Sequence, residues 1–268
     1  MKLLVAGGSE VDAGKTTFTT GLIERTGIRG YKPRAGNGYL YDQDDYRRAV
    51  EEGRLYGKDA KQIAAANEGS TRPEEINPVH RLWLPTPGRG KGILGRDGRR
   101  FLFDRVTIDS DTYVVNDETD VPPAAERAFP LDRAHRVESL EALDELMARY
   151  HAPALDALAD RIAGREGAIV ESYADIARPL SSFVPDAVAV VEPRRCRVYD
   201  GDRYAKACEV ASGSAHEGRL EERVGSVVDL LEPIESVALP ALSSAERGDL
   251  AVVADAYADS YDALLGAV

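Results

Sequence analysis

Cysteine is scarce in this chain, and long apolar runs are lacking. The two cysteines among 268 residues, Cys196 and Cys208, do not have the Cys-x-x-Cys spacing of a zinc site or redox motif. We therefore predict two small core residues and no disulfide framework. No stretch approaches the roughly 20 apolar residues that span a bilayer, and the N-terminus leads directly into a strand instead of a signal peptide. The sequence predicts a soluble, cytoplasmic protein without membrane contact.

Basic residues are fewer than acidic ones, so the formal net charge is −12. A nucleic acid backbone or an anionic membrane would be repelled over most of such a surface. This balance argues against nucleic acid as a partner. Any anionic ligand must enter a locally positive site.

Short apolar runs alternate with stretches of helical periodicity, which is typical of an α/β fold. The predicted strands lie at 2–6 and 30–34, in a hairpin formed by "RFLFDRVTI" and "TYVVN", and in "GAIVES", "AVAVVEP" and "SVALPAL". The predicted helices lie at 16–26, at 44–67 as two helices broken near Gly57, at 139–163 and at 245–265. This order predicts a largely parallel sheet flanked by helices. We expect a single domain over 1–268 with a β-hairpin insertion at about 86–120.

A glycine-rich stretch, "GGSEVDAGKTT" at 7–17, follows the first predicted strand. Five residues separate Gly8 from Gly-Lys-Thr, one more than in the usual P-loop. The chemistry still suits a phosphate cradle, because backbone N–H groups and a helix N-terminus face inward, Lys15 adds a positive charge and the Thr16 hydroxyl can hold Mg²⁺. The residues expected to contact the nucleotide are Gly8, Ser9, Asp12, Ala13, Gly14, Lys15, Thr16 and Thr17.

A P-loop needs an acidic partner for its metal ion, because Mg²⁺ takes one or two carboxylates beside phosphate oxygens. Glu171 follows three apolar residues at the end of the strand "GAIVES". This position is the edge where open α/β sheets bind ligands. Glu171 is therefore the predicted metal ligand, with Asp175 as a substitute and a turn or helix cap as the alternative role for Glu171.

Several segments in the same order resemble the dethiobiotin synthetase family of P-loop ATPases. "GSEVDAGKT" resembles that family's loop, in which an acidic residue stands where Asp12 stands here. "YKPRAGN" resembles its Lys-Pro segment and maps the active-site lysine onto Lys32. "GKDAKQIA" resembles the segment with a metal-binding aspartate at a helix start, here Asp59. "EEINPVHRLWLPTPG" and "GAIVES" complete a resemblance that covers residues 1 to about 175.

The resemblance implies a P-loop NTPase fold and a Mg²⁺-dependent, ATP-using carbon–nitrogen ligase. In the family, γ-phosphate passes to a carbamate or carboxylate oxygen of a small molecule. The implied catalytic residues are Lys15 and Lys32, and the implied metal ligands are Thr16, Asp59 and Glu171. The family also implies a homodimer.

This chain departs from the family after Glu171. Ser172, Tyr173, Ala174 and Asp175 replace a Gly-Ala-Gly-Gly run, and "VVEPRRC" lacks the asparagine that reads adenine in the family. The second substrate and the choice of ATP or GTP therefore stay open. The alternative function is a nucleotide-dependent regulatory or scaffold ATPase that acts on a protein partner.

Four further groups of residues have more than one interpretation. His80 is either a packing residue in a β-like run or a base. The arginines of 194–197 either contact a phosphate or an acidic substrate or form a solvated loop. The aspartates of 42–45 either bind a second metal or cap the helix that starts near Asp44. The basic residues of 89–100 could cover the nucleotide or bind an anionic partner.

Overall fold

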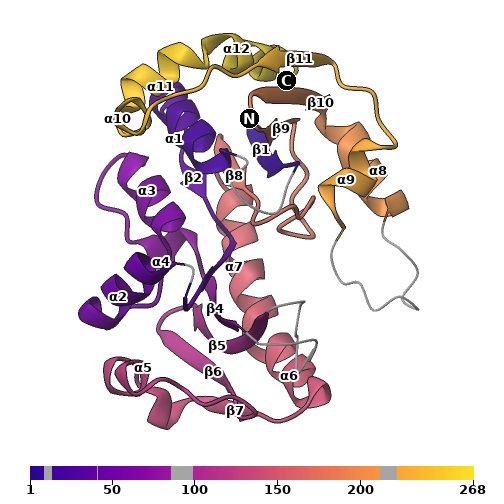
Figure 1. Cartoon of the computed structure of the whole chain (residues 1–268). Coiled ribbons are helices and arrows are strands. Elements are labelled where there is room, and N and C mark those ends of the chain that lie inside the picture. The colour runs from indigo at the N-terminus through magenta and orange to yellow at the C-terminus, as the bar shows by residue number, and fades with distance from the viewer. Residues whose placement is uncertain (9–13, 41, 86–98, 212–221) are drawn as a thin grey trace. The chain divides into compact units, whose positions relative to one another are not determined.

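The computed structural model of the chain describes residues 1–8, 14–40, 42–85, 99–211 and 222–268, which form two compact units (Figure 1). The first unit contains Met1–Pro33, Gln62–Thr71 and Ala159–Val268, and the second contains Arg34–Lys61 and Arg72–Leu158. The fold class is α/β, as predicted, with two sheets flanked by helices. The single-domain organisation stays a prediction. None of the described helices is long and apolar enough to cross a bilayer.

The described part of the first unit contains a six-stranded sheet. Its strands, in spatial order, are β11 (Glu235–Ala238), β10 (Arg195–Asp200), β9 (Ala187–Glu192), β1 (Lys2–Gly7), β8 (Ala168–Glu171) and β2 (Gly30–Tyr31). The strands from β9 to β2 pair in parallel, whereas β10 is antiparallel to both β9 and β11. The sheet is therefore mixed at one end, where the sequence predicted a largely parallel sheet.

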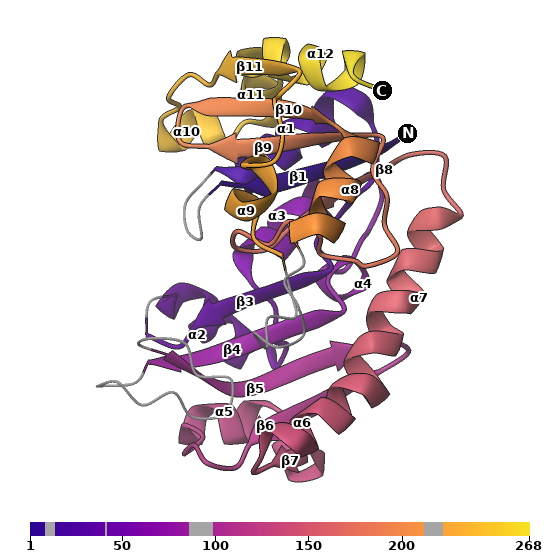
Figure 2. The same cartoon turned by 90° about the vertical axis from the view of Figure 1, so that its right-hand side faces the viewer.

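Helices cover both faces of this sheet, because β1, β8 and β9 are apolar and buried along nearly all of their length. α1 (Lys15–Thr26), α11 (Leu250–Ala256) and α12 (Ala258–Gly266) lie on one face, and α8 (Gly201–Ala211) and α9 (Val224–Val228) lie on the other (Figure 2). The Tyr261 hydroxyl donates a 2.9 Å hydrogen bond to the Phe18 main-chain oxygen and so joins α12 to α1.

The helix predicted at 245–265 is divided into α10 (Ser244–Arg247), α11 and α12. Ser243 and Glu246 form a capping box at the start of α10. The Asp249 carboxylate then accepts hydrogen bonds from the Ala251 and Val252 amides at the start of α11. Local caps thus interrupt a continuous apolar periodicity.

The described part of the second unit contains a five-stranded sheet. Its strands are β3 (Arg34–Gly38), β4 (Val79–Pro85), β5 (Arg99–Thr107), β6 (Asp111–Asn116) and β7 (His135–Val137), in that spatial order. β4, β5 and β6 are antiparallel, so the predicted hairpin is confirmed as β5 and β6. β3 pairs with β4, and β6 with β7, in parallel.

The prediction of one strand at 30–34 is wrong. The segment is interrupted at Lys32 and Pro33, and its two ends belong to different sheets. Proline has no N–H to give to a strand ladder. β2 therefore ends at Tyr31 in the first unit, and β3 begins at Arg34 in the second.

Two separate cores lie on the two faces of the second sheet. Tyr46 of α2 (Gln43–Glu52) and Ala125 of α5 (Pro123–Ala128) pack with Phe103 on one face. Leu143 of α6 (Leu140–Leu146) packs with Phe101 on the other. The remaining helical segments are α3 (Lys58–Ala66), α4 (Pro73–Ile76), a 3-10 turn at Leu131–Arg133, a π turn at Met147–His151 and α7 (Ala152–Ala163). The predicted break near Gly57 and the predicted helical stretch 139–163 are confirmed.

Candidate functional site

The register of the parallel strands brings the predicted site residues to one edge of the first sheet. Val5 of β1 pairs with Glu171 at the end of β8. Tyr31 of β2 pairs with Val170, so Lys32 follows alongside Glu171. Because parallel strands end at the same edge, Gly8 after β1, Lys32 and Glu171 all gather there.

Gly14 joins the glycine loop to α1 in a left-handed conformation, with φ 82° and ψ 11°. A side chain at this position would be strained, because L-residues rarely adopt a positive φ. α1 begins at the next residue, Lys15, which places the amide groups of the first turn at the loop. Ser9, Asp12 and Ala13 of the predicted nucleotide site lie outside the described residues.

The Lys15 side chain is buried and lies back over the start of the loop. Its Nζ donates a 2.8 Å hydrogen bond to the main-chain oxygen of Ala174. A Cβ added to Gly7 would lie 2.5 Å from the same Nζ, so a side chain at residue 7 would displace the lysine from this position. A positive charge is thereby held between Gly7 and the segment after β8.

Glu171 is the centre of the predicted metal site and is fully buried. Its Oε1 accepts a 2.9 Å hydrogen bond from the Thr16 hydroxyl and forms an ion pair with Lys32 Nζ. Lys32 Nζ also donates to the Ser172 main-chain oxygen at 3.1 Å. The structure thus brings together Thr16, Lys32 and Glu171 as the sequence predicted.

The second oxygen of Glu171, Oε2, is buried and has no hydrogen-bond partner among the described residues. Most buried polar atoms are satisfied, so such an orphan needs a ligand or an explanation. A carboxylate oxygen next to a threonine hydroxyl suits a hard cation such as Mg²⁺. The described residues contain no group of three or more His, Cys, Asp or Glu that could hold a metal. A cation here would therefore depend on phosphate oxygens and water for its other ligands.

The other predicted metal ligands fall elsewhere. Asp59 lies in the first turn of α3 and belongs to the second unit, so its role in the metal site stays a prediction. Asp175 forms an ion pair with Arg223, whereas Glu171 is the carboxylate that contacts Thr16, and the role of Asp175 as a substitute stays a prediction.

His80 is a buried packing residue, and its interpretation as a base is wrong. Its ring is fully buried, 3.3 Å from Asn77 Oδ1 and within hydrogen-bond distance of Asn37 Oδ1. Burial, followed by the charge of Arg105, lowers its pKa to about 3. A ring so difficult to protonate and so far from solvent serves the fold of the second unit.

Asp42 and Asp45 make side-chain contacts other than the predicted cap on α2. Asp42 occupies the N-cap position of α2, but its side chain makes no cap hydrogen bond there and accepts instead from the Gly38 amide at 2.7 Å. Asp45 Oδ2 accepts from the Lys58 amide at 2.8 Å, which caps the start of α3. The predicted cap on α2 is therefore wrong for these two residues. Asp45 joins α2 to α3 instead.

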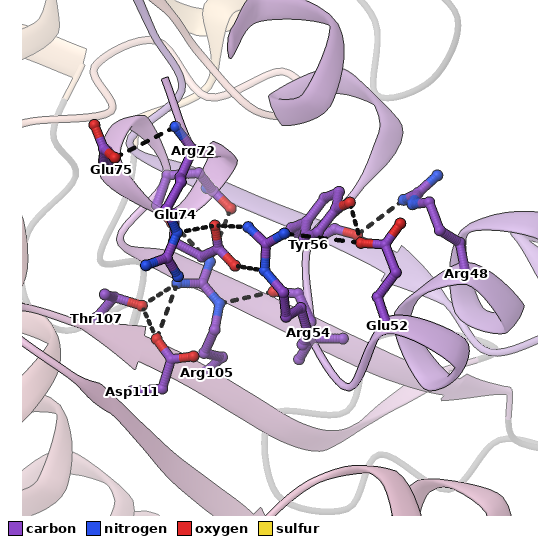
Figure 3. Close-up of polar contacts among 12 residues, drawn as sticks. Arg48, Glu52, Arg54, Tyr56, Arg72, Glu74, Glu75, Arg105, Thr107 and Asp111 are labelled. Carbon is purple, nitrogen blue, oxygen red and sulfur yellow. Dashed lines mark hydrogen bonds and ion pairs between the residues drawn. The ribbon is translucent and has the colours of Figure 1, made fainter. Parts of the chain in front are cut away.

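The second unit also contains a polar network that the sequence did not predict (Figure 3). Fully buried Arg105 donates 2.7 Å hydrogen bonds to the main-chain oxygens of Leu55 and Asn77. Arg54 binds both carboxylate oxygens of buried Glu74, at 2.9 and 2.7 Å. Burial raises the pKa of Glu74, but the hydrogen bonds from Arg54 and from the main chain, together with the charges of Arg105 and Arg54, outweigh it and the pKa is lowered overall. The network joins the segments at Leu55 and Asn77 to β5. Nothing in the sequence indicated it, because arginine usually lies at the surface.

Of the arginines of 194–197, only Arg194 lies in an exposed turn. Arg194 forms the turn between β9 and β10 with φ 66°, and Arg195 and Arg197 lie on β10, paired with Glu192. Of the basic residues at 89–100, those at 99 and 100 begin β5, and the others lie outside the described residues.

Comparisons with protein-family models, with curated proteins and with solved structures found no match for this chain. Its function is therefore inferred from its own residues.

Proposed function

We propose that the first unit binds ATP with Mg²⁺ and transfers the γ-phosphate to a carboxylate or carbamate oxygen of a small molecule. In this proposal the chain is an ATP-dependent carbon–nitrogen ligase similar to the dethiobiotin synthetases. The principal support is Glu171, whose Oε1 contacts both Thr16 and Lys32 while the buried Oε2 lacks a partner in the described part of the chain. A carboxylate in that state, beside a glycine loop, suits a metal–phosphate complex.

Each residue has a distinct role in the proposed reaction. Lys15 would leave the Ala174 oxygen and place its charge on the β- and γ-phosphates. Thr16 and Glu171 would hold the cation, which supplies positive charge to the phosphate oxygens. Lys32 would stabilise the charge that spreads over the transferring phosphoryl group.

The proposed chemistry is phosphoryl transfer. An oxygen of the acceptor attacks the γ-phosphorus, the bond from phosphorus to the bridging oxygen breaks, and ADP leaves with that electron pair. An amine then displaces phosphate from the activated acceptor. Ser172 and Asp175, which replace glycines of the family's Gly-Ala-Gly-Gly run, point to an acceptor other than the diamine of the dethiobiotin synthetases.

Titration calorimetry tests the nucleotide site. We expect Mg²⁺-dependent ATP binding that Lys15→Ala weakens about 10- to 100-fold, because charge-assisted hydrogen bonds contribute about 1.5–3 kcal/mol each. Lys206→Ala is the matched control, since Lys206 is exposed on α8 of the same unit. An equal loss of ATP affinity in Lys15→Ala and Lys206→Ala would refute the proposal. ATP binding that is insensitive to Mg²⁺ would also refute it.

Phosphate release in the presence of small carboxylates and amines then separates a ligase from a simple nucleotide binder. Release that appears only with an acceptor supports the ligase. Lys32→Ala should abolish that acceptor-dependent release while Mg-ATP still binds.

A second candidate function is a nucleotide-dependent switch, and the contact of Lys15 with Ala174 favours it. Ala174 has a positive φ of 46°, and the next residue, Asp175, pairs with Arg223 and accepts from the Val224 amide at 2.7 Å. If bound phosphate drew Lys15 away from the Ala174 oxygen, the segment at Ala174 and Asp175 could move. That movement would be passed to α9 through Arg223 and Val224. Two results together would support the switch over the ligase. Mg-ATP binding should change the rate of hydrogen exchange at 173–178 and 222–228, and ATP turnover should not depend on an acceptor.

A further inference from the structure

A second carboxylate, Glu192, lies beside Gly8 at the start of the glycine loop. Gly7 pairs with Val191 in the parallel ladder of β1 and β9, and the Gly8 amide donates a 3.0 Å hydrogen bond to the Val191 oxygen. A Cβ added to Gly8 would lie 2.5 Å from Glu192 Cγ and 2.7 Å from its Oε1. A side chain at residue 8 would therefore have to displace the Glu192 side chain, which occupies the space beside Gly8.

Two arginines of β10 hold this carboxylate. Arg195 contacts Oε2 with Nε at 2.8 Å and with Nη2 at 2.6 Å. Arg197 donates from Nη2 to Oε1 at 2.9 Å. Two positive charges thus offset one negative charge next to a phosphate-binding loop, where an unpaired carboxylate would repel polyphosphate. The pairing also fixes the orientation of the carboxylate.

The position of Glu192 indicates which part of a nucleotide it would meet. The sheet order β9, β1, β8 places Glu192 on one flank of the glycine loop and Glu171, with Thr16 and Lys32, on the other. If the metal and the transferring phosphate lie on the β8 flank, as proposed above, the other end of the phosphate chain points to the β9 flank. The group attached directly to that end is the ribose.

We propose that Glu192, held by Arg195 and Arg197, binds the ribose hydroxyls of the nucleotide and sets a preference for ribonucleotides. This inference rests on the proposed nucleotide site. Carboxylates are strong acceptors for the neighbouring hydroxyls of a ribose, and each carboxylate oxygen accepts about two hydrogen bonds. Arg197 makes one contact with Oε1, so this oxygen keeps an acceptor position.

The test compares Mg-ATP, Mg-2′-deoxy-ATP and magnesium tripolyphosphate by titration calorimetry on the wild type and on Glu192→Gln. We expect the wild type to prefer ATP over deoxy-ATP by about tenfold, and Glu192→Gln to remove most of that preference. Tripolyphosphate has no ribose, so its affinity should not fall in the variant. Glu222→Gln is the matched control, because Glu222 is also paired with an arginine, Arg178, in the same unit.

Glu192→Asp provides a second variant if the glutamine variant does not fold. It keeps the negative charge for the arginines but shortens the side chain, so the ribose preference should fall while thermal unfolding stays close to that of the wild type. An unchanged ratio of ATP to deoxy-ATP affinity in folded variants overturns the ribose assignment. If tripolyphosphate and ATP both fail to bind the wild type, the proposed function fails as well.

Discussion

Glu171 and Lys32 form an ion pair in which both side chains are almost completely removed from solvent, with exposures of 0% and 3%. The pair joins the ends of two adjacent parallel strands, because Val170 of β8 and Tyr31 of β2 are register partners immediately before it. A buried pair of this kind is costly to assemble and still more costly to break. It therefore makes the candidate site a sensitive part of the first unit.

Removal of one partner of this pair should destabilise the protein strongly. We expect Lys32→Met to lower the free energy of unfolding by about 3–5 kcal/mol, because it leaves the Glu171 charge buried without its partner. The double variant Lys32→Met, Glu171→Leu should recover most of that loss. Urea denaturation measures both.

The exposed pair of Arg25 and Asp262 is the control for that measurement, since its side chains are 33% and 62% exposed. Arg25→Ala should cost less than about 1 kcal/mol. A similar cost for Lys32→Met would show that the buried pair does not carry the expected energy.

The two glycines at the ends of α1 should separate stability from binding. Gly14 and Gly27 have φ values of 82° and 66°, and neither has another described atom within 4 Å of an added Cβ. Alanine at either position should cost about 1–2 kcal/mol through backbone strain alone. Only Gly14→Ala should also weaken Mg-ATP binding, as measured by calorimetry, because Gly14 leads into Lys15 and Thr16. Equal effects of the two variants on binding would contradict the placement of the phosphate site.

His80 should make the protein less stable as the pH falls. Its pKa is lowered from 6.5 to about 3 by burial, so between these two values the unfolded chain takes up a proton that the folded chain does not. Stability therefore decreases as the pH falls through this window, by up to about 1.4 kcal/mol per pH unit. Replacement by a group that does not titrate, His80→Gln, should flatten this part of the profile in urea titrations. A slope identical to that of the wild type would show that the ring is protonated in the folded state.

The two cysteines should be unreactive in the native protein. Both are free and buried, and burial raises the pKa of each thiol to about 12. Thiolate is the reactive species, so iodoacetamide should modify neither residue at mildly alkaline pH. Mass spectrometry should find both modified in concentrated guanidinium chloride. Rapid modification of the native chain would mean that Cys196 or Cys208 opens to solvent.

Local patterns predicted much of the first unit. The apolar run before the glycine loop became β1, and the Gly-Lys-Thr sequence began α1, because a strand, a left-handed glycine and a helix start each have a strong local signal. The run before Glu171 became β8 for the same reason. These three elements place Thr16 and Glu171 in contact.

The sequence did not predict strand β10, because its charged residues make the segment resemble a loop. Arg195 and Arg197 alternate with buried residues, as in any strand with two unlike faces, but arginines beside a turn also resemble a solvated loop. Their partner Glu192 lies on the neighbouring strand, and side-chain pairing across strands is decided by register. No local signal could assign it.

The sequence by itself determined the α/β class, the glycine loop with its helix, and the identity of the residues at the strand ends, because backbone sterics and apolar periodicity act over a few residues. Tertiary structure alone decided that two mixed sheets form and that Lys15 docks on Ala174. It also decided that Glu171 and Glu192 take opposite flanks of the same loop. Those outcomes depend on strand order and register, which are set by the packing of segments far apart in the chain.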